Sequence, residues 1–359
     1  MTEPDPRPND PRERREPELF RRYPALSHTP WVALLDAPTP VEPAPKLGNL
    51  AGARRLFVKR DDISARPYAG GKPRKLEFLL GEALASGATR VVTWGGVGSN
   101  QAVATAAHAA RLGLRTTLLL LPQKSSPRVR ENLLADVCFG ATLRLVQSQA
   151  RAATLAGTLD AYAIPIGGSS PLGNLGFVNA AFELDRQISA GELPEPDRLY
   201  IPMGTMGSAV GLSIGLRAAG RKTLVVAVRA SNLGTSSAAR FRQLFERTVA
   251  YLVERDPTFP HLEFSQAGVE LDGSELGGGY AVPTNRARHA VEVARELGHW
   301  QLETTYTGKA LASLLADASS HAGQVVLFWN THNSLALPIE NIDPEQVPPE
   351  FRVYMGRAR

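Results

Sequence analysis

Along most of the chain, short apolar runs alternate with segments in which apolar residues have helical spacing. Short continuous apolar runs predict buried strands at Leu56–Val58, Val91–Trp94, Thr116–Leu121, Leu143–Val146, Leu199–Pro202, Leu224–Val228 and Val325–Trp329. Segments with helical apolar spacing lie between them, at Leu76–Ser86, Ala102–Leu112, Val129–Phe139, Val178–Ile188, Ser208–Ala219, Ser237–Glu254, Arg286–Leu297 and Lys309–Ala318. Short buried strands that alternate with amphipathic helices indicate an α/β fold with mostly parallel sheets covered on both faces.

Two glycine-rich junctions between a strand and a helix, near residues 96 and 204, predict two open twisted sheets rather than one. We expect a smaller α/β domain at residues 78–185, inserted in a larger domain formed by residues 19–77 and 186–359. A functional cleft would lie between the domains, at the carboxyl ends of the strands.

The N-terminal segment differs in composition from the rest of the chain. Residues 1–18 are rich in proline and charge and have no apolar periodicity, which predicts a disordered tail. Residues 31–45 alternate proline with short apolar runs, which predicts an irregular segment that wraps a domain.

Composition narrows the class of protein. No apolar run approaches the roughly 20 residues that a membrane-spanning helix needs, so we expect a cytoplasmic protein without a membrane partner. The single Cys138 and the widely spaced histidines predict neither an internal disulfide nor a metal site. The net charge of +5 suits an anionic cofactor or substrate, but it is spread along the chain, so no nucleic-acid partner is expected.

The junction near residue 204 has the features of an anion site. The run Gly204, Thr205, Met206, Gly207 and Ser208 follows a predicted strand and begins a predicted helix. Backbone N–H groups and the helix dipole would point at one spot, where a phosphate fits, although such turns also occur for steric reasons alone. Ser213, in a Gly-x-Ser-x-Gly match, falls inside the helix rather than on a turn, which argues against a hydrolase nucleophile.

The junction near residue 96 carries polar side chains at the start of the next helix. Ser99, Asn100 and Gln101 follow a glycine turn and are well placed to bind a carboxylate. The alternative is that Ser99 or Asn100 simply caps its own helix, and spacing alone leaves both interpretations open.

Lys72 follows two glycines and precedes a predicted helix. Most lysines in such positions are surface charges. Two further cations, Arg74 and Lys75, would depress its pKa, and the glycines would allow a planar ligand to approach closely. An amine of low pKa is what imine formation with an aldehyde cofactor requires.

An ordered set of motifs distinguishes between these interpretations. In chain order they are Val58–Asp62, Gly70–Phe78, Gly95–Gln101, Gly167–Gly173, Gly204–Ser208, Tyr280 with Val282-Pro283, and Tyr306–Lys309. The set resembles the fold-type II pyridoxal-phosphate enzymes, whose fold is tryptophan synthase β-like. Within them it is most similar to the 1-aminocyclopropane-1-carboxylate deaminase and D-cysteine desulfhydrase family, over roughly residues 30–340.

The resemblance implies a cofactor, pyridoxal 5'-phosphate, and a role for each matching residue. Lys72 would be the Schiff-base lysine, and Asn100 would contact the cofactor's ring hydroxyl. The phosphate would be held by Gly204, Thr205, Met206, Gly207 and Ser208. Ser99, Asn100 and Gln101 would bind the carboxylate of a small amino-acid substrate, with Ser99 also moving a proton. Tyr280 and Tyr306 would line the substrate pocket as catalytic residues, and the assembly would be a homodimer.

Thr307 distinguishes the two namesakes of the family. The matching position faces the pyridine nitrogen and is glutamate in the cyclopropane-opening enzymes but threonine in the desulfhydrase-like ones. A neutral hydroxyl does not keep that nitrogen protonated as a carboxylate does, so the ring withdraws electrons less strongly. We therefore expect a lyase or deaminase that performs β-elimination and yields a 2-keto acid and ammonia.

The chain also departs from the family pattern. Gly71 stands where asparagine usually precedes the lysine, and Pro73 replaces a hydroxyl or small residue. Thr331-His332-Asn333 stands where the family commonly has Thr-Gly-Gly, which should reshape the pocket; His332 would be structural or an acid or base. Two alternatives remain open: a β-replacement synthase in a biosynthetic pathway, and a cofactor-binding protein without turnover.

Overall fold

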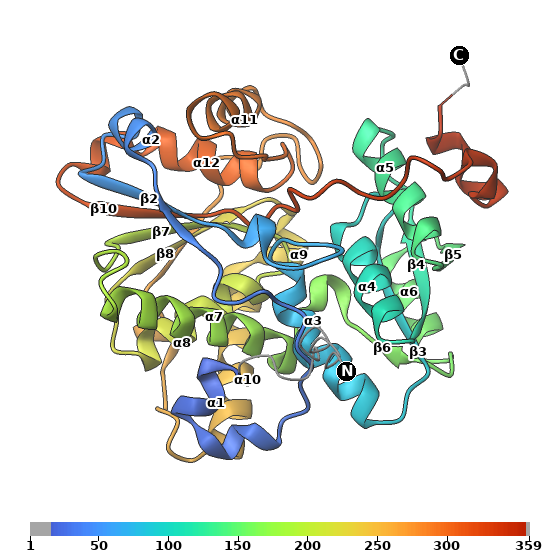
Figure 1. The fold of residues 1–359 in the computed structure, drawn as a ribbon, viewed down its shortest axis with the longest axis horizontal. Coiled ribbons are helices and arrows are strands. Elements are labelled where there is room, and N and C mark those ends of the chain that lie inside the picture. The colour runs from blue at the N-terminus through green and yellow to red at the C-terminus, as the bar shows by residue number, and fades with distance from the viewer. Residues whose placement is uncertain (1–15, 357–359) are drawn as a thin grey trace, which may run out of the picture.

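The computed structural model describes residues 16–356 and arranges them around two sheets (Figure 1). The larger sheet has six strands in the order β1-β2-β10-β7-β8-β9, and the smaller has four in the order β5-β4-β3-β6. The strands are β1 Val41–Pro43, β2 Arg55–Lys59, β3 Arg90–Gly96, β4 Arg115–Leu121, β5 Thr142–Leu145, β6 Tyr162–Ala163, β7 Arg198–Met203, β8 Leu224–Arg229, β9 Val269–Asp272 and β10 Val325–Trp329. Neighbouring strands run parallel except β1 and β2, which confirms the predicted α/β class.

Helices connect the strands and cover both faces of each sheet. The α-helices are α1 Glu18–Arg22, α2 Pro45–Leu50, α3 Lys72–Ala85, α4 Asn100–Arg111, α5 Pro127–Cys138, α6 Gln149–Ala156, α7 Pro171–Ser189, α8 Gly207–Ala218, α9 Leu233–Ser236, α10 Ala238–Arg255, α11 Asn285–Gly298 and α12 Thr307–Ala316. Short 3₁₀ helices are η2 Pro24–His28, η3 Asp61–Ile63, η4 Ile166–Gly168, η5 Phe264–Gln266, η6 Ala318–His321, η7 Pro344–Gln346 and η8 Pro349–Tyr354.

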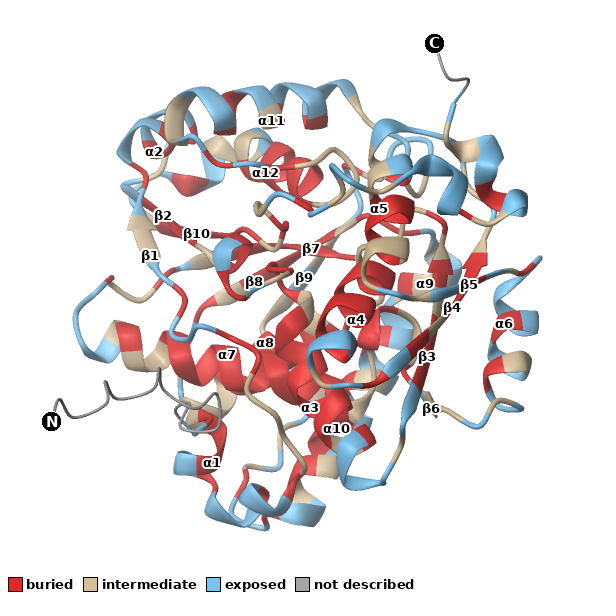
Figure 2. Cartoon of the chain, turned by 45° about the vertical axis from the view of Figure 1, so that its right-hand side comes forward, coloured by how far each residue is buried: buried red, intermediate tan, exposed pale blue. Residues whose placement is uncertain are grey.

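Both faces of the larger sheet are buried. Successive side chains of a strand point to opposite faces, so a continuous apolar strand such as β10 contributes to both cores. In β10, Val325, Leu327 and Trp329 join the core that contains α7, α8 and α10. Val326 and Phe328 join the opposite core, with α2, α11 and α12. The helices α7 and α8 are buried along most of their length (Figure 2).

The smaller sheet repeats this arrangement with its own helices. Leu118 and Leu120 of β4 pack toward α5, whereas Leu119 packs toward α6. The four strands lie between residues 90 and 163, inside the predicted inserted range. The boundaries at residues 78 and 185 stay a prediction.

The C-terminal segment connects the two layers. After β10 it crosses from the larger sheet to the side of α5 (Figure 1). There Val347 and Phe351 are buried in the core of the smaller sheet. The loop that begins this crossing, residues 331–333, therefore lies between the two layers.

The predicted strands and long helices all form, with shifts at their ends. The helix predicted from Leu76 begins at Lys72, with Pro73 in its first turn, a position that tolerates proline. The helix predicted from Val178 begins at Pro171, where the Ser170 hydroxyl caps it by accepting from the Gly173 amide at 3.1 Å. Glycines in its first turns allow close packing, since a side chain at Gly176 would clash with the backbone of Arg74.

The sequence analysis missed the short elements β1, β6, β9, α1, α2, α6 and α9. Short segments have weak patterns of their own, and packing decides whether they form. The expected irregular segment 31–45 ends in one of them, β1. The predicted tail falls mostly on residues 1–15, which lie outside the described residues, and Glu18 begins α1.

No helix of residues 16–356 combines the length and apolar character that crossing a membrane would need.

Candidate active site

A cavity of about 260 Å³ lies between the two sheets, among the loops that follow the carboxyl ends of their strands. Parallel strands bring these loops together, because their carboxyl ends meet at one edge of each sheet. Most of the predicted site residues line this cavity: Lys72, Ser99, Asn100, Gln101, Gly204, Thr205, Met206, Ser208, Tyr280, Tyr306 and Thr307. Gly207 is not on its wall but begins α8 directly beside it.

Lys72 is the first residue of α3, after Gly71 at the N-cap. Burial lowers its pKa to about 8, because a buried ammonium loses its hydration. The prediction that Arg74 and Lys75 cause this lowering is wrong, because burial alone accounts for it. The Arg74 guanidinium instead pairs with Asp61, at 2.7 Å.

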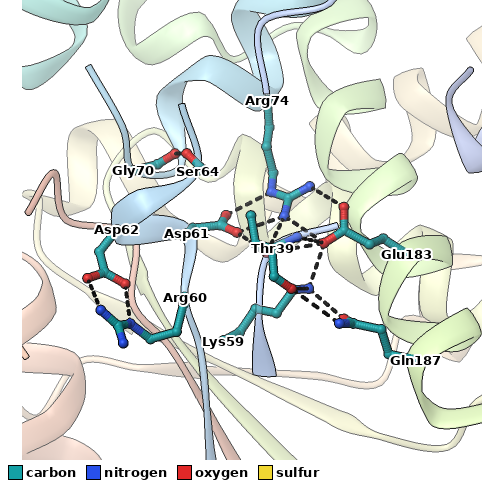
Figure 3. Close-up of polar contacts among 10 residues, drawn as sticks. All are labelled: Thr39, Lys59, Arg60, Asp61, Asp62, Ser64, Gly70, Arg74, Glu183 and Gln187. Carbon is teal, nitrogen blue, oxygen red and sulfur yellow. Dashed lines mark hydrogen bonds and ion pairs between the residues drawn. The ribbon is translucent and has the colours of Figure 1, made fainter. Parts of the chain in front are cut away.

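A buried polar network fixes the start of α3 in place (Figure 3). Arg74 contacts both Asp61, after β2, and Glu183 of α7, the latter at 3.1 Å. Lys59 of β2 also pairs with Glu183, at 2.6 Å, and donates to Gln187. Burial would raise the pKa of Glu183, but Arg74 and Lys59 hold it well below its ordinary value. The network joins three elements and fixes the turn that carries Lys72.

The start of α8 is open to an anion. Its N-cap is Met206, in the left-handed conformation at φ 69°, and the Met206 side chain does not cap the helix. The first amides of a helix have no acceptor inside it, so a ligand can accept from them. A Cβ atom at Gly207 would lie 2.3 Å from Asn174 Oδ1, 2.6 Å from Ser169 Oγ and 2.8 Å from Lys75 Nζ, so a larger residue would displace these side chains.

Lys75 is a site residue that the sequence analysis did not assign. It lies one turn after Lys72 on α3, lines the cavity, and donates to the Ser169 hydroxyl at 3.0 Å. Ser169 in turn contacts the Thr205 hydroxyl at 2.7 Å and accepts from the Gly207 amide at 3.2 Å. Burial lowers the pKa of Lys75 well below its ordinary value, and the charge on Lys72 lowers it further. The spacing of three residues from Lys72 was the available signal, because it places both side chains on one face of a helix.

The start of α4 differs from that of α8, because its own N-cap residue caps the helix. The Ser99 hydroxyl accepts from the Ala102 amide at 3.3 Å, so Ser99 caps its helix as the structural interpretation predicted. Ser99, Asn100 and Gln101 also line the cavity, so the two interpretations are compatible. The Asn132 side chain of α5 donates to the Asn100 side chain at 3.1 Å and holds it in place.

Tyr280 and Tyr306 meet on the wall of the cavity. Their rings pack edge to face with centroids 6.0 Å apart. Burial raises the pKa of both hydroxyls, so both are neutral at physiological pH. Beside them, Glu303 accepts from the amides of Thr305, Tyr306 and Thr307, which fixes the first turn of α12.

His332 and Asn333 line the same cavity. The Asn333 side chain accepts from the Ala69 amide at 2.8 Å, and so ties the loop after β10 to the loop before Lys72. Burial, together with the charge of Arg128, lowers the pKa of His332 to about 3. Its Nδ1 atom is buried without a hydrogen-bond partner among the described residues.

The residues present suit an anionic aldehyde cofactor. One end of the cavity has the start of α8, whose N-cap residue makes no side-chain cap, with Lys75 beside it, which suits a phosphate. Its wall also carries a second lysine of lowered pKa, which suits attack on an aldehyde. Fold and site together define a class of enzymes that hold such a cofactor between two α/β layers.

Comparisons with known proteins give the same class. The family model described as "Pyridoxal-phosphate dependent enzyme" matches residues 32–331, and the chain belongs to this family. The nocardicin C-9' epimerase of Nocardia uniformis subsp. tsuyamanensis is 33% identical over 91% of this chain and 98% of its own. A D-cysteine desulfhydrase of Salmonella choleraesuis (strain SC-B67) is 32% identical over 87% of this chain and 96% of its own.

A solved structure described as an ACC deaminase homologue shares the fold. It superimposes with a TM-score of 0.74 at 27% identity and covers 89% of this chain and 96% of its own. The chain is therefore a pyridoxal-phosphate dependent enzyme, and the predicted cofactor, enzyme class and family resemblance are confirmed.

Proposed function

We propose that this enzyme catalyses β-elimination from a small α-amino acid, in the manner of D-cysteine desulfhydrase, and releases a 2-keto acid and ammonia. The observation that carries the proposal is that Lys72 and the open start of α8 line one cavity. When bound, pyridoxal phosphate withdraws electrons from the substrate's α-carbon and lowers the barrier to breaking a bond there. The rest of the chemistry depends on how this chain's residues hold, orient and protonate the reactants.

Residues from several places in the chain would hold the cofactor. Lys72 would attach to it through Nζ, and Asn100 would contact its ring hydroxyl. The phosphate would bind the amides of Gly204–Ser208, with Lys75 as the neighbouring cation. Thr307 would face the ring nitrogen with a neutral hydroxyl, which favours elimination over reactions that need a strongly electron-withdrawing ring.

Three side chains at the start of α4 would bind the substrate carboxylate, namely those of Ser99, Asn100 and Gln101. This contact would orient the α-carbon toward Lys72, whose lowered pKa lets the released amine accept the α-proton. Ser99 lies on the same turn and could also move a proton. Tyr280 and Tyr306, both neutral, would line the pocket as hydrogen-bond donors near the departing β-substituent.

Epimerisation is a second candidate, because one relative of similar identity is named nocardicin C-9' epimerase. In that reaction the α-proton leaves one face and returns to the other, and no β-substituent departs. The same lysine and the same carboxylate contacts would serve, so the residues of the site alone favour neither outcome.

Product analysis tests the proposal. The purified holoenzyme is mixed with a panel of D- and L-amino acids that carry a β-leaving group, while the cofactor's absorbance, keto acid and ammonia are followed. Elimination predicts keto acid and ammonia in equal amounts; an added thiol that appears in a new amino acid instead indicates β-replacement.

The other outcomes contradict the proposal. Exchange of the α-proton in deuterium oxide with inversion, but without keto acid, indicates an epimerase. A cofactor whose absorbance no amino acid changes indicates a binding protein without turnover. Lys72→Ala, which removes the attachment point, is the negative control for all of these measurements.

We also propose that the enzyme is a cytoplasmic homodimer, as the resemblance to its family implies. Sedimentation equilibrium of the purified enzyme tests the dimer, with a single species of twice the chain mass as the expected result.

A further inference from the structure

The motif Tyr306–Lys309 ends in a lysine that the proposed function does not use. Lys309 lies on α12, is fully buried and is not on the cavity wall, whereas Tyr306, one turn earlier, lines the cavity. The Lys309 ammonium donates to the carbonyl oxygens of Leu276, at 2.8 Å, and Gly279, at 3.3 Å. Lys309 therefore contacts the loop before α11 from behind the cavity wall.

The loop that accepts these hydrogen bonds, residues 273–284, carries Tyr280 on the cavity wall. The Gly279 carbonyl belongs to the peptide group that joins Gly279 to Tyr280, so the ammonium holds the backbone directly before the tyrosine. The Tyr280 ring packs edge to face against Tyr306, with centroids 6.0 Å apart. Lys309 and Tyr306 thus contact the backbone before Tyr280 and its ring, both from the start of α12.

The loop's own backbone hydrogen bonds near Tyr280 are long. The amides of Leu276, Gly279 and Val282 donate to carbonyls within the loop at 3.2, 3.3 and 3.3 Å, which is at the upper end of the range for N–H···O bonds. Ala281, directly after Tyr280, has a φ of 57°, in the left-handed region. A residue other than glycine keeps such a conformation only where its surroundings hold it. The Lys309 ammonium is one group that holds this backbone from outside the loop.

The charge of Lys309 is directed to the loop rather than to a carboxylate. Burial lowers the pKa of Lys309, and the charges of Glu275 and Glu303 oppose that shift. Each of these carboxylates has other partners: Glu275 pairs with Arg286 at 2.6 Å, and Glu303 accepts from the amides of residues 305–307. The hydrogen bonds of the ammonium itself go to the two loop carbonyls, so an uncharged side chain of similar length would fill the space and release the loop.

We propose that Lys309 is a positioning residue, which fixes the backbone before Tyr280 and so holds the tyrosine hydroxyl in the substrate pocket. Lys309 does this without touching substrate or cofactor. This inference rests on the proposed function, because it takes Tyr280 as a hydrogen-bond donor near the departing β-substituent. A displacement of about 1 Å in such a group can lower a rate by about 100-fold, so a contact behind the wall can control the reaction.

Amide hydrogen exchange of the holoenzyme tests the hold on the loop. Lys309→Met keeps the length of the side chain and removes its donors. The amides of residues 276–282 should then exchange about tenfold faster or more, because the loop loses hydrogen bonds from a charged group. Peptides from β10 should exchange as in the wild type. Lys222→Met, which changes an exposed lysine, is the matched control and should leave exchange in the loop unchanged.

A double-mutant cycle tests whether Lys309 acts through Tyr280. With an amino acid that the wild type converts to keto acid, Lys309→Met should lower kcat by about 10- to 100-fold and change KM less. Tyr280→Phe, which removes the hydroxyl, should also lower kcat. If the lysine acts by placing that hydroxyl, adding Lys309→Met to Tyr280→Phe should change kcat by less than about twofold. Effects that multiply instead would overturn the proposal, because the lysine would then act elsewhere.

Failure of this proposal and failure of the proposed function give different results. An unchanged exchange rate in the loop, or an unchanged kcat in Lys309→Met, overturns the role of Lys309 and leaves the elimination intact. If Lys309→Met does not fold, Lys309→Gln, which keeps a donor group, is measured in the same way, and global unfolding of both contradicts a role confined to the loop.

If no amino acid yields keto acid, the proposed function fails, and the exchange experiment still tests the hold of Lys309 on the loop. The double-mutant cycle is then run on the dissociation constants of the amino acids, read from the absorbance of the bound cofactor.

Discussion

Burial controls the protonation of single residues in this site. It lowers the pKa of Lys72 to about 8 and that of Lys75 well below its ordinary value. It lowers the pKa of His332 to about 3 and raises that of Tyr306. Each shift favours the uncharged form, because a buried charge loses its hydration. A bound phosphate would reverse the shift at Lys75, since a nearby opposite charge stabilises the ammonium.

The lowered pKa of Lys72 predicts how cofactor binding depends on pH. Only the neutral amine attacks an aldehyde, and with a pKa of about 8 roughly one Lys72 in ten is neutral at pH 7. The rate of reconstitution of the apoenzyme should therefore rise about tenfold between pH 7 and pH 9 and then level off. Stopped-flow absorbance at a fixed cofactor concentration measures it. A rate that still rises at pH 10 would show that Lys72 keeps its ordinary pKa.

The starts of three helices, α3, α4 and α8, shape the site. The start of α4 is capped by its own N-cap residue, Ser99, whereas the N-cap residue of α8, Met206, provides no side-chain cap. The start of α3 is fixed in place by the buried network around Arg74 and Glu183 (Figure 3). That network fixes the helix that carries both cavity lysines, so its effects should be visible in stability and in cofactor binding.

Glu183→Ala should destabilise the fold strongly. The substitution leaves Arg74 and Lys59 buried without their shared carboxylate, and breaking a buried pair in this way costs about 3–5 kcal/mol. Urea denaturation of the apoenzyme at pH 7 measures the free energy of unfolding. Glu246→Ala, which removes an exposed ion pair with Arg242, is the control and should leave the midpoint unchanged.

The loss of stability in Glu183→Ala should also depend on pH. Because the folded-state pKa of Glu183 is lowered, its contribution is present above the ordinary value of 4.5 and declines as the pH falls below it. The difference between wild type and Glu183→Ala should therefore narrow in acid. A constant difference would show that the lost stability comes from packing rather than charge.

Gly207→Ala tests the open start of α8. The added methyl group would lie 2.3 Å from Asn174 Oδ1, 2.6 Å from Ser169 Oγ and 2.8 Å from Lys75 Nζ, so it displaces Lys75, the cation that we expect beside the phosphate. Loss of one charge-assisted hydrogen bond corresponds to about 1.5–3 kcal/mol, or roughly 10- to 100-fold weaker cofactor binding. Equilibrium titration of the apoenzyme measures it. Gly234→Ala, with no atom near the added group, should bind as the wild type does.

For the whole molecule, the cavity is where the loops of the two sheets and the crossing C-terminal segment meet. Lys72 and Thr307 approach it from the larger layer and Ser99 from the smaller one. A ligand that fills the cavity contacts both layers at once. It should therefore stabilise the molecule as a unit.

Cofactor binding should raise the midpoint of thermal unfolding in a dose-dependent way. A ligand that binds only the folded state at 100 times its dissociation constant adds about 2.7 kcal/mol. Scanning fluorimetry of the apoenzyme over a range of cofactor concentrations measures the shift. Lys72→Ala should show a smaller one, and no shift in the wild type would contradict the assignment of the cavity.

The chain's local patterns determined much of this protein on their own. Apolar runs such as Val325–Trp329 predicted the strands, and the runs around Lys72, Ser99 and Gly204 predicted the cavity walls, because each motif is continuous in sequence. Periodicity reports burial directly, so the α/β class followed from it.

Only the tertiary structure decided which distant groups meet and how charged they are. Arg74 was expected to act on Lys72, but its partner Glu183 lies more than a hundred residues away along the chain. Burial and long-range contact are properties of the folded molecule, and for that reason the pKa values could not be obtained from the sequence pattern.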